Sequence, residues 1–196
     1  MASAESADYN RLRQAFEKLV TFEDSEWEDA RKRFIPLSYA KDTIITAEGQ
    51  TEPYFYFVLK GVHHLYYQTP NGDEITLGFS FDDNFSGSYE SFITQKPSTI
   101  YFQTLTDTDV LAIGHTDINE LFDTYKNFER WGRLFIQYIF FGRGKREIEL
   151  ATLSAEERYH IFMQRIPAEL QAITQKYIAS YLSMTPETLS RIRAKR

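Results

Sequence analysis

Basic residues concentrate at the C-terminal end of a chain that is acidic as a whole. The 196 residues carry a formal net charge of -6 at pH 7. The segment from Thr174 to Arg196 holds five basic residues and one acidic residue, a net charge of +4, so the rest of the chain carries -10. Because guanidinium and ammonium groups bind phosphates, this charge separation indicates a polyanionic partner.

The same end of the chain has the pattern of a short, well-capped helix. In the segment MTPETLSRIRAKR, Thr185 is a good N-cap residue, and Pro186 suits the first helical position, where no N–H is needed. Glu187 falls near the positive end of the helix dipole, and the basic residues fall near its negative end. Such a helix is typical of a solvated surface, a membrane contact or a nucleic-acid reader.

The histidines do not have the spacing of a metal site. His63 and His64 are adjacent in a predicted strand, where successive side chains point to opposite faces, so the pair cannot chelate one ion. We expect one inward and one outward histidine. The sequence also lacks a Gly-rich phosphate loop, a Gly-x-Ser-x-Gly motif and any cysteine. We therefore expect that the protein has no metal site, binds no cofactor and is not an enzyme.

The composition is that of a folded protein. Hydrophobic residues make up 42% of the chain and aromatic residues 16%, which argues against disorder. The first residues, MASAESADYNRLRQ, have neither the apolar stretch nor the positive charge of a targeting signal, and no run of eighteen apolar residues occurs. We expect a soluble cytoplasmic protein without a membrane contact.

Residues 1–116 predict a β-barrel preceded by helices, within an α+β fold. From Tyr9 to Arg33 apolar residues repeat at helical spacing, and Ser25 with Glu28 matches a capping box before a second helix. From Phe34 to Ile113, short runs rich in aromatic and β-branched residues alternate with turn sequences. Many short strands without helices between them favour an antiparallel barrel or sandwich, here a jelly-roll barrel.

Residues 117–150 predict one long helix that is apolar nearly all round. Four aromatic residues follow the spacing of a heptad seam: Phe128, Trp131, Phe135 and Tyr138. A second stripe contains Leu134, Phe141 and Ile148. Such a helix is either a central core helix, or it packs on its own barrel with one face and on a twin helix with the other, making a dimer. For the dimer we assign the contact to the heptad seam.

Residues 151–196 predict a compact helical unit that begins near a capping box of Ser154 and Glu157. It contains three helical segments: AEERYHIFMQR, QKYIASYLS and PETLSRIRAK. Only a few residues separate the second segment from the third, and the small residue Ala179 lies where the two helices would cross. This is the pattern of a helix-turn-helix, whose second helix presents its polar face outward.

The order of barrel, long helix and helix-turn-helix resembles the Crp/Fnr family of bacterial transcription regulators over almost the whole chain. The DNA-binding signature of that family is similar to the segment TQKYIASYLSMTPETLSRIRAKR. The C-terminal sequence also resembles that of regulators from the Bacteroidetes branch. FYFVLKGVHHLYYQTPNGDEITLGF resembles the cyclic-nucleotide-binding-type barrel of the family, with Gly61 and Gly72 at expected turns. The resemblance implies a homodimeric regulator that binds double-stranded DNA, and it allows RNA polymerase as a further partner.

The resemblance also assigns the DNA contacts. Glu187 and Arg191 fall at base-reading positions, where the acid accepts from cytosine and the arginine donates to guanine. Helical spacing puts Pro186 and Ser190 on the same outward face, with Thr185 as the cap. Five residues are assigned to phosphates: Thr174, Lys176, Arg193, Lys195 and Arg196. Since the family usually continues into a β-hairpin wing and this sequence stops at Arg196, we expect most or all of the wing to be missing.

The predicted effector pocket departs from the nucleotide-binding pattern, which has Gly-Glu-aliphatic and later Arg-Ser/Thr-Ala. In FSGSYESFITQKPSTIYF, Gly87 and Thr99 fit, but Ser88 replaces the acid and Ser98 the arginine. A buried phosphate without its cation is strongly unfavourable, so we expect cyclic AMP not to bind. The predicted pocket for an effector of unknown identity consists of six residues: Gly87, Ser88, Tyr89, Lys96, Ser98 and Thr99.

Two alternatives stay open from the sequence. His115 and His160 stand alone, which leaves a haem-sensing version of the family open. The second alternative is a barrel module that binds a small molecule or a protein and has no sequence-specific DNA recognition. Salt-dependent retention on duplex DNA would separate this module from a regulator.

Overall fold

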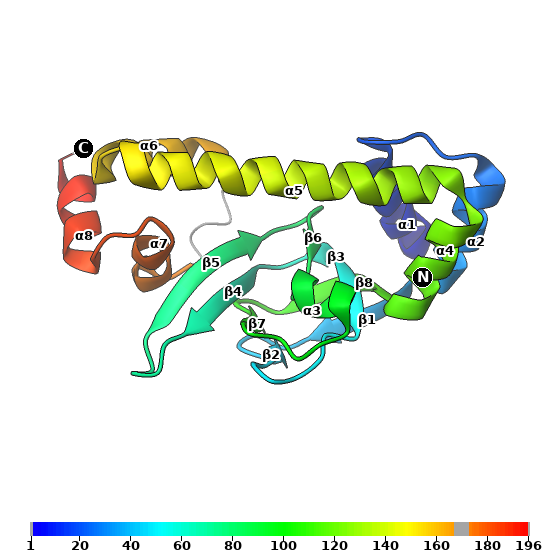
Figure 1. The fold of residues 1–196 in the computed structure, drawn as a ribbon, viewed down its shortest axis with the longest axis horizontal. Helices are drawn as coiled ribbons and strands as arrows, with labels where there is room; N and C mark the ends of the chain where they lie inside the picture. Colours follow the sequence, from blue (N-terminus) through cyan, green and yellow to red (C-terminus); the bar gives the residue numbers. More distant parts are fainter. Residues whose placement is uncertain (1, 167–172, 196) are drawn as a thin grey trace.

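The computed structural model describes residues 2–166 and 173–195. Its barrel lies between two helical groups, and one long helix runs along the barrel from one group to the other (Figure 1). The helices are α1 (Ala2–Glu17), α2 (Asp24–Arg33), α3 (Tyr89–Thr94), α4 (His115–Thr124), α5 (Lys126–Thr152), α6 (Ala155–Arg165), α7 (Gln175–Tyr181) and α8 (Pro186–Ala194).

The barrel consists of two four-stranded sheets in which every pair of neighbouring strands is antiparallel. One sheet has the order β1-β8-β3-β6 and the other the order β2-β7-β4-β5. The strands are β1 (Ile35–Tyr39), β2 (Ile44–Thr46), β3 (Tyr54–Lys60), β4 (His63–Gln68), β5 (Glu74–Ser80), β6 (Phe85–Ser86), β7 (Tyr101–Thr104) and β8 (Thr108–Gly114). The predicted α+β fold class with an antiparallel barrel is confirmed.

Two local features differ from the sequence prediction near the N-terminus and inside the barrel. The N-cap of α2 is Glu23, whose backbone N–H donates to the Glu26 carboxylate at 3.0 Å, so the predicted capping box of Ser25 and Glu28 is wrong. The short elements β6 and α3 were not predicted.

Gly61 and Gly72 lie in turns as expected, with φ angles of 121° and 87° that favour glycine.

The predicted single helix over 117–150 is two helices. Tyr125 has an extended backbone conformation, which ends α4 and starts α5, and α5 continues to Thr152. The break lets α4 pack against α5, where the Phe122 ring lies over Gly132. A Cβ atom on Gly132 would be 3.0 Å from that ring, so the missing side chain permits the close approach.

Three of the four predicted seam residues belong to the core of this chain. Phe128, Trp131 and Phe135 are 0%, 1% and 8% exposed. Trp131 lies with its ring centroid 4.2 Å from that of Phe16 on α1, and Phe135 lies 5.6 Å from Phe55 on β3. The seam prediction is therefore wrong for these residues, because α1 and the barrel already cover that face of α5. Tyr138, the fourth residue, is 68% exposed.

Candidate nucleic-acid interface and effector pocket

Local interactions position α7, the following turn and α8, the elements that cover the predicted helix-turn-helix. The Thr185 hydroxyl accepts a hydrogen bond from the Thr188 N–H at 3.2 Å and so caps α8. Ser183, in the turn, has a φ of 52°, and the Met184 N–H donates to the Ala179 carbonyl at 3.0 Å. Ala179 is fully buried between the two helices. The small side chain therefore allows α7 and α8 to cross closely.

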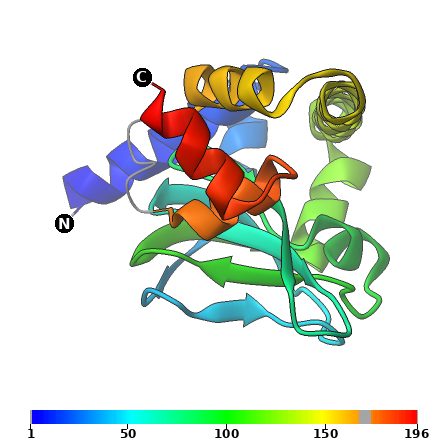
Figure 2. The same cartoon turned by 90° about the vertical axis from the view of Figure 1, so that its left-hand side faces the viewer.

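The recognition candidate α8 has one apolar face and one polar face. Leu189 and Ile192 are buried in a cluster with residues of α6 and α7. Five predicted DNA contacts lie exposed on α8: Pro186, Glu187, Ser190, Arg191 and Arg193. The helix lies at the end of the molecule away from α1 and α2, and Figure 2 looks onto it. The structure therefore brings these residues together on an accessible surface.

The predicted DNA contacts outside the exposed face of α8 differ in their surroundings. The Lys176 ammonium lies 3.1 Å from the Glu74 carboxylate on β5, and the Lys195 ammonium lies 3.1 Å from Glu156 on α6. Thr174 is the exposed N-cap residue of α7. Arg196 lies outside the described residues. Of the four basic residues of the C-terminal segment that the structure describes, two are therefore paired with carboxylates.

Glu187 lies in the first turn of α8, and Arg191 lies one turn further along the helix. Hydrogen bonds from the Glu187 backbone N–H and the Thr185 hydroxyl lower the pKa of the Glu187 carboxyl, and the Arg191 charge adds to this effect. The Arg191 guanidinium also donates to the Thr188 hydroxyl at 3.2 Å. An ionised acceptor and a cationic donor are thus held side by side, which is the chemistry needed to read base edges.

Helix α7 lies on the outer face of β5 and β4, which changes the surroundings of the two histidines. The His64 and Tyr177 rings lie 4.3 Å apart, and the Ser180 hydroxyl accepts from the Thr76 N–H at 2.9 Å. Both His63 and His64 are fully buried. The two point to opposite faces as predicted, but the expected outward histidine is covered by α7. Burial lowers the pKa of His64 to about 4.

The predicted effector pocket is closed by direct contacts between its own polar groups. The hydroxyls of Ser88 and Ser98 are hydrogen-bonded to each other at 2.7 Å, and both residues are buried. The Ser98 hydroxyl also lies 2.7 Å from the Ile100 carbonyl. The two positions that would face the ribose and the phosphate in a nucleotide-binding relative therefore contact each other.

A buried carboxylate lies beside this pocket, and the sequence analysis missed it. Glu52 is fully buried, and its carboxylate accepts from the Thr46 hydroxyl at 2.8 Å, the Tyr56 hydroxyl at 3.1 Å and the Ser88 N–H at 3.3 Å. Burial raises the pKa of Glu52 above its ordinary value. Its only sequence signal is an acid directly before an apolar strand, within a segment read as a turn. An acidic group therefore lies beside Ser88, and it offers no positive charge to a phosphate.

The remaining predicted pocket residues do not converge on this point. Lys96 and Thr99 are exposed, and the Lys96 ammonium makes no hydrogen bond or ion pair with the described residues. Tyr89 packs between the rings of Phe55 and Phe135, and burial raises the pKa of its hydroxyl to about 12. Gly87 has a φ of 135°, which requires glycine.

The barrel matches a known protein family. Residues 36–125 match the family model of the cyclic nucleotide-binding domain. No curated protein matches the chain significantly. Within residues 2–166 and 173–195, no helix is long and apolar enough to cross a membrane. The same ranges contain no group of three or more histidine or acidic side chains that could hold a metal ion.

Solved structures extend the likeness to nearly the whole chain. FixK2 from Bradyrhizobium japonicum has a TM-score of 0.74 at 18% identity, covering 83% of each chain. The c-di-GMP-responsive regulator CLP of Xanthomonas campestris has a TM-score of 0.67 at 16% identity, covering 88% of this chain and 91% of its own. The catabolite activator protein of Thermus thermophilus has a TM-score of 0.56 at 19% identity, covering 89% and 83%. The fold is that of Crp/Fnr transcriptional regulators.

Proposed function

We propose that this chain is a dimeric DNA-binding transcriptional regulator of the Crp/Fnr type. The observation that carries the proposal is the division of α8 into two faces. Leu189 and Ile192 anchor the helix, while Glu187, Ser190 and Arg191 are exposed and have side chains that can bond to base edges. Arg193 is exposed beside them and is suited to a phosphate. The likeness to Crp/Fnr structures supports the same function.

The exposed side of α5 supports a dimer. Phe140, Phe141 and Ile148 are 71%, 69% and 64% exposed in the single chain. Gly144 lies between them, one turn from Phe140 and one turn from Ile148, and it would let a second helix approach closely. Three large apolar side chains exposed together on one helix face indicate a contact with another protein surface. The proposed dimer contact therefore differs from the predicted seam. It includes Phe141 and Ile148 of the second stripe but not Leu134, which packs against the core cluster.

The sensor function differs from that of a cyclic AMP receptor. Glu52 places a carboxylate beside Ser88, and Ser88 and Ser98 are hydrogen-bonded to each other, so an anionic cyclic nucleotide would find no cation at these positions. As a regulator of transcription the protein would work in the cytoplasm, with RNA polymerase as a further partner. The absence of a wing and the Bacteroidetes type stay predictions from the sequence.

The proposal is tested by DNA binding of single variants. Arg191→Ala should weaken binding to the preferred duplex by about 1–3 kcal/mol and relax its sequence preference, whereas Lys195→Ala should weaken all sequences alike. Arg130→Ala is the matched control, because Arg130 is an exposed arginine at the far end of α5. Fluorescence anisotropy over a salt series gives the affinities and the salt slope.

The test also distinguishes the alternative module. If the wild-type chain shows no salt-dependent binding to any duplex, the protein is a small-molecule- or protein-binding barrel instead. If Arg191→Ala and Arg130→Ala weaken binding equally on specific and random duplexes, α8 acts only as part of a general positive charge, and the base-reading proposal is wrong.

A further inference from the structure

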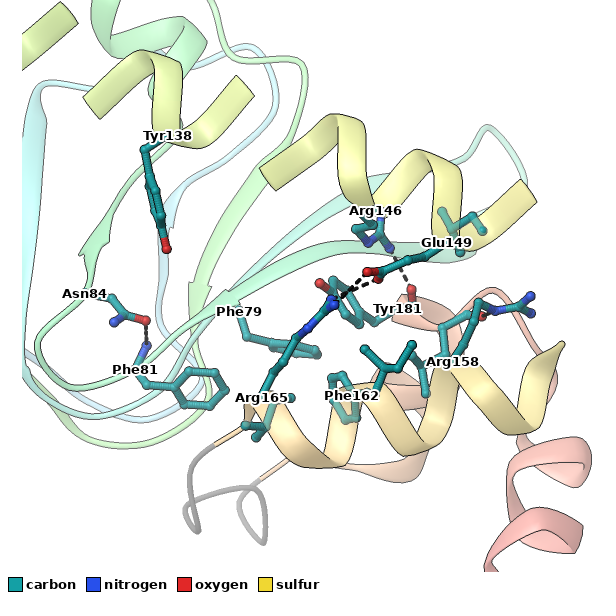
Figure 3. A pocket seen from close by; sticks show the side chains of 14 residues that line it. Phe79, Phe81, Asn84, Tyr138, Arg146, Glu149, Arg158, Phe162, Arg165 and Tyr181 are labelled. Carbon is teal, nitrogen blue, oxygen red and sulfur yellow. Dashed lines mark hydrogen bonds and ion pairs between the residues drawn. The ribbon is translucent and has the colours of Figure 1, made fainter. Parts of the chain in front are cut away.

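A cavity of about 370 Å³ lies away from the predicted effector pocket, between β5, α5, α6 and α7 (Figure 3). This volume is within the range of small-molecule sites. Phe79 and Phe81 line it from the barrel, Phe162 and Ile161 from α6, and Tyr181 from α7. Figure 3 shows the aromatic rings of Phe79, Phe81 and Phe162 grouped on one side, below the polar ends of the α5 residues.

The charged residues of the cavity are unbalanced. Among the described residues, three arginines and one glutamate line it, a net charge of +2. Arg165 holds Glu149 through two hydrogen bonds of 2.6 Å and 2.9 Å, and this pairing lowers the pKa of the Glu149 carboxyl. The Glu149 carboxylate is therefore ionised and already paired with Arg165. Arg146 and Arg158 have no ion pair with a described acidic residue.

The two unpaired arginines are used differently. Arg158 donates through three of its nitrogens to the carbonyls of Leu153, Leu182 and Ser183, so its guanidinium is fixed at the ends of α5 and α7. Arg146 makes one hydrogen bond, to the Tyr181 carbonyl at 2.6 Å, and lies over the Tyr181 ring at 4.2 Å. Since an arginine carries five N–H donors, Arg146 keeps donors for another partner.

We infer that this cavity is a binding site for an organic anion with an apolar body, such as an aromatic or alkyl carboxylate. Arg146 would bind the carboxylate, with Arg158 adding positive charge beside it. The apolar body would lie against Phe79, Phe81 and Phe162. Carboxylate oxygens match the geometry of the free guanidinium donors, and an apolar body matches the rings opposite them.

The test uses the full-length chain with anilinonaphthalene sulfonate, an anion whose fluorescence rises in apolar sites. Wild-type protein should bind the dye, and naphthoate should displace it, whereas the neutral naphthamide of the same shape should not. Arg146→Gln should raise the dissociation constant for the dye about tenfold or more, because a charge-assisted hydrogen bond is lost. Arg143→Gln, an exposed arginine on the same helix outside the cavity, should leave it unchanged.

Two further variants control for a misfolded Arg146→Gln protein and for dye binding at another site. Ile161→Trp fills the cavity without touching a charge and should abolish binding even if Arg146→Gln lowers the melting temperature. Phe141→Ser removes an exposed ring of α5 and should leave binding intact. The inference is overturned if Arg146→Gln and Ile161→Trp both bind like the wild type, if naphthamide competes as well as naphthoate, or if Phe141→Ser alone removes the signal. No DNA is present, so the outcome is independent of the proposed function.

Discussion

The variant Phe141→Ala should weaken the proposed dimer while the folded monomer stays nearly as stable as the wild type. Its side chain is 69% exposed in the single chain, so Phe141→Ala removes little internal packing. Complete burial of a phenylalanine side chain contributes about 1.5–3 kcal/mol. A two-fold interface contains the residue twice, so the variant should weaken the dimer by about 3–6 kcal/mol. This corresponds to a dissociation constant roughly 10²- to 10⁴-fold higher.

Sedimentation velocity over a concentration series measures this change, with thermal unfolding of the same samples. Trp131→Ala is the contrasting variant: Trp131 is 1% exposed, and its loss should destabilise the fold itself by about 3–5 kcal/mol. Tyr67→Ala is the control for an exposed aromatic residue outside α5. If Phe141→Ala dimerises with the wild-type constant, the exposed face of α5 is not the dimer contact, and the reasoning is refuted.

Three other predictions concern the barrel. Cyclic AMP at millimolar concentration should leave the melting temperature unchanged, whereas a ligand at a hundred times its dissociation constant would add about 2.7 kcal/mol; a clear upward shift would show that a cation does reach the pocket. His64 has a pKa of about 4 when folded and about 6.5 when unfolded, so this residue alone should lower the stability by on the order of 3 kcal/mol as pH falls between these values, in addition to the contribution of the buried His63. His64→Phe should remove the His64 contribution in urea titrations and leave that of His63, and an unchanged pH profile would contradict the assignment. Glu52 has a raised pKa when folded, so its ionisation should destabilise the wild type as pH rises from about 4.5 toward neutrality. Glu52→Gln should therefore gain stability relative to the wild type over that range, and a constant difference would mean that Glu52 does not titrate there.

The parts of the structure that depend on local sequence could be predicted. Thr185 caps α8 because the capping hydrogen bond spans only three residues, and Leu189 and Ile192 face inward because the helical period fixes their direction. The same holds for Ser154, which accepts from the Glu157 N–H at 3.3 Å. The strand runs were also visible, because aromatic and β-branched residues alternate there with clear turn signals.

Two errors are local, the capping box of α2 and the helix break at Tyr125, and the others concern contacts between distant parts of the chain. The periodicity of α5 shows two apolar faces but not which one meets the rest of the chain. That choice depends on Phe16 of α1, more than a hundred residues away, which packs on Trp131. The Glu52 carboxylate was missed for a similar reason: its burial follows from the packing of Thr46, Tyr56 and Ser88 around it. A turn-like sequence carries no sign of such an environment.

Selection of bound duplexes from a random pool tests the central proposal most directly. In a two-fold dimer the two copies of α8 would enter successive major grooves about 34 Å apart. The account predicts enrichment of a near-palindromic sequence whose half-sites are centred about 10 base pairs apart, and loss of preference at one position of each half-site with Arg191→Ala. Recovery of no common sequence, or of the same sequence with equal strength by Arg191→Ala, would contradict the proposal that α8 reads DNA.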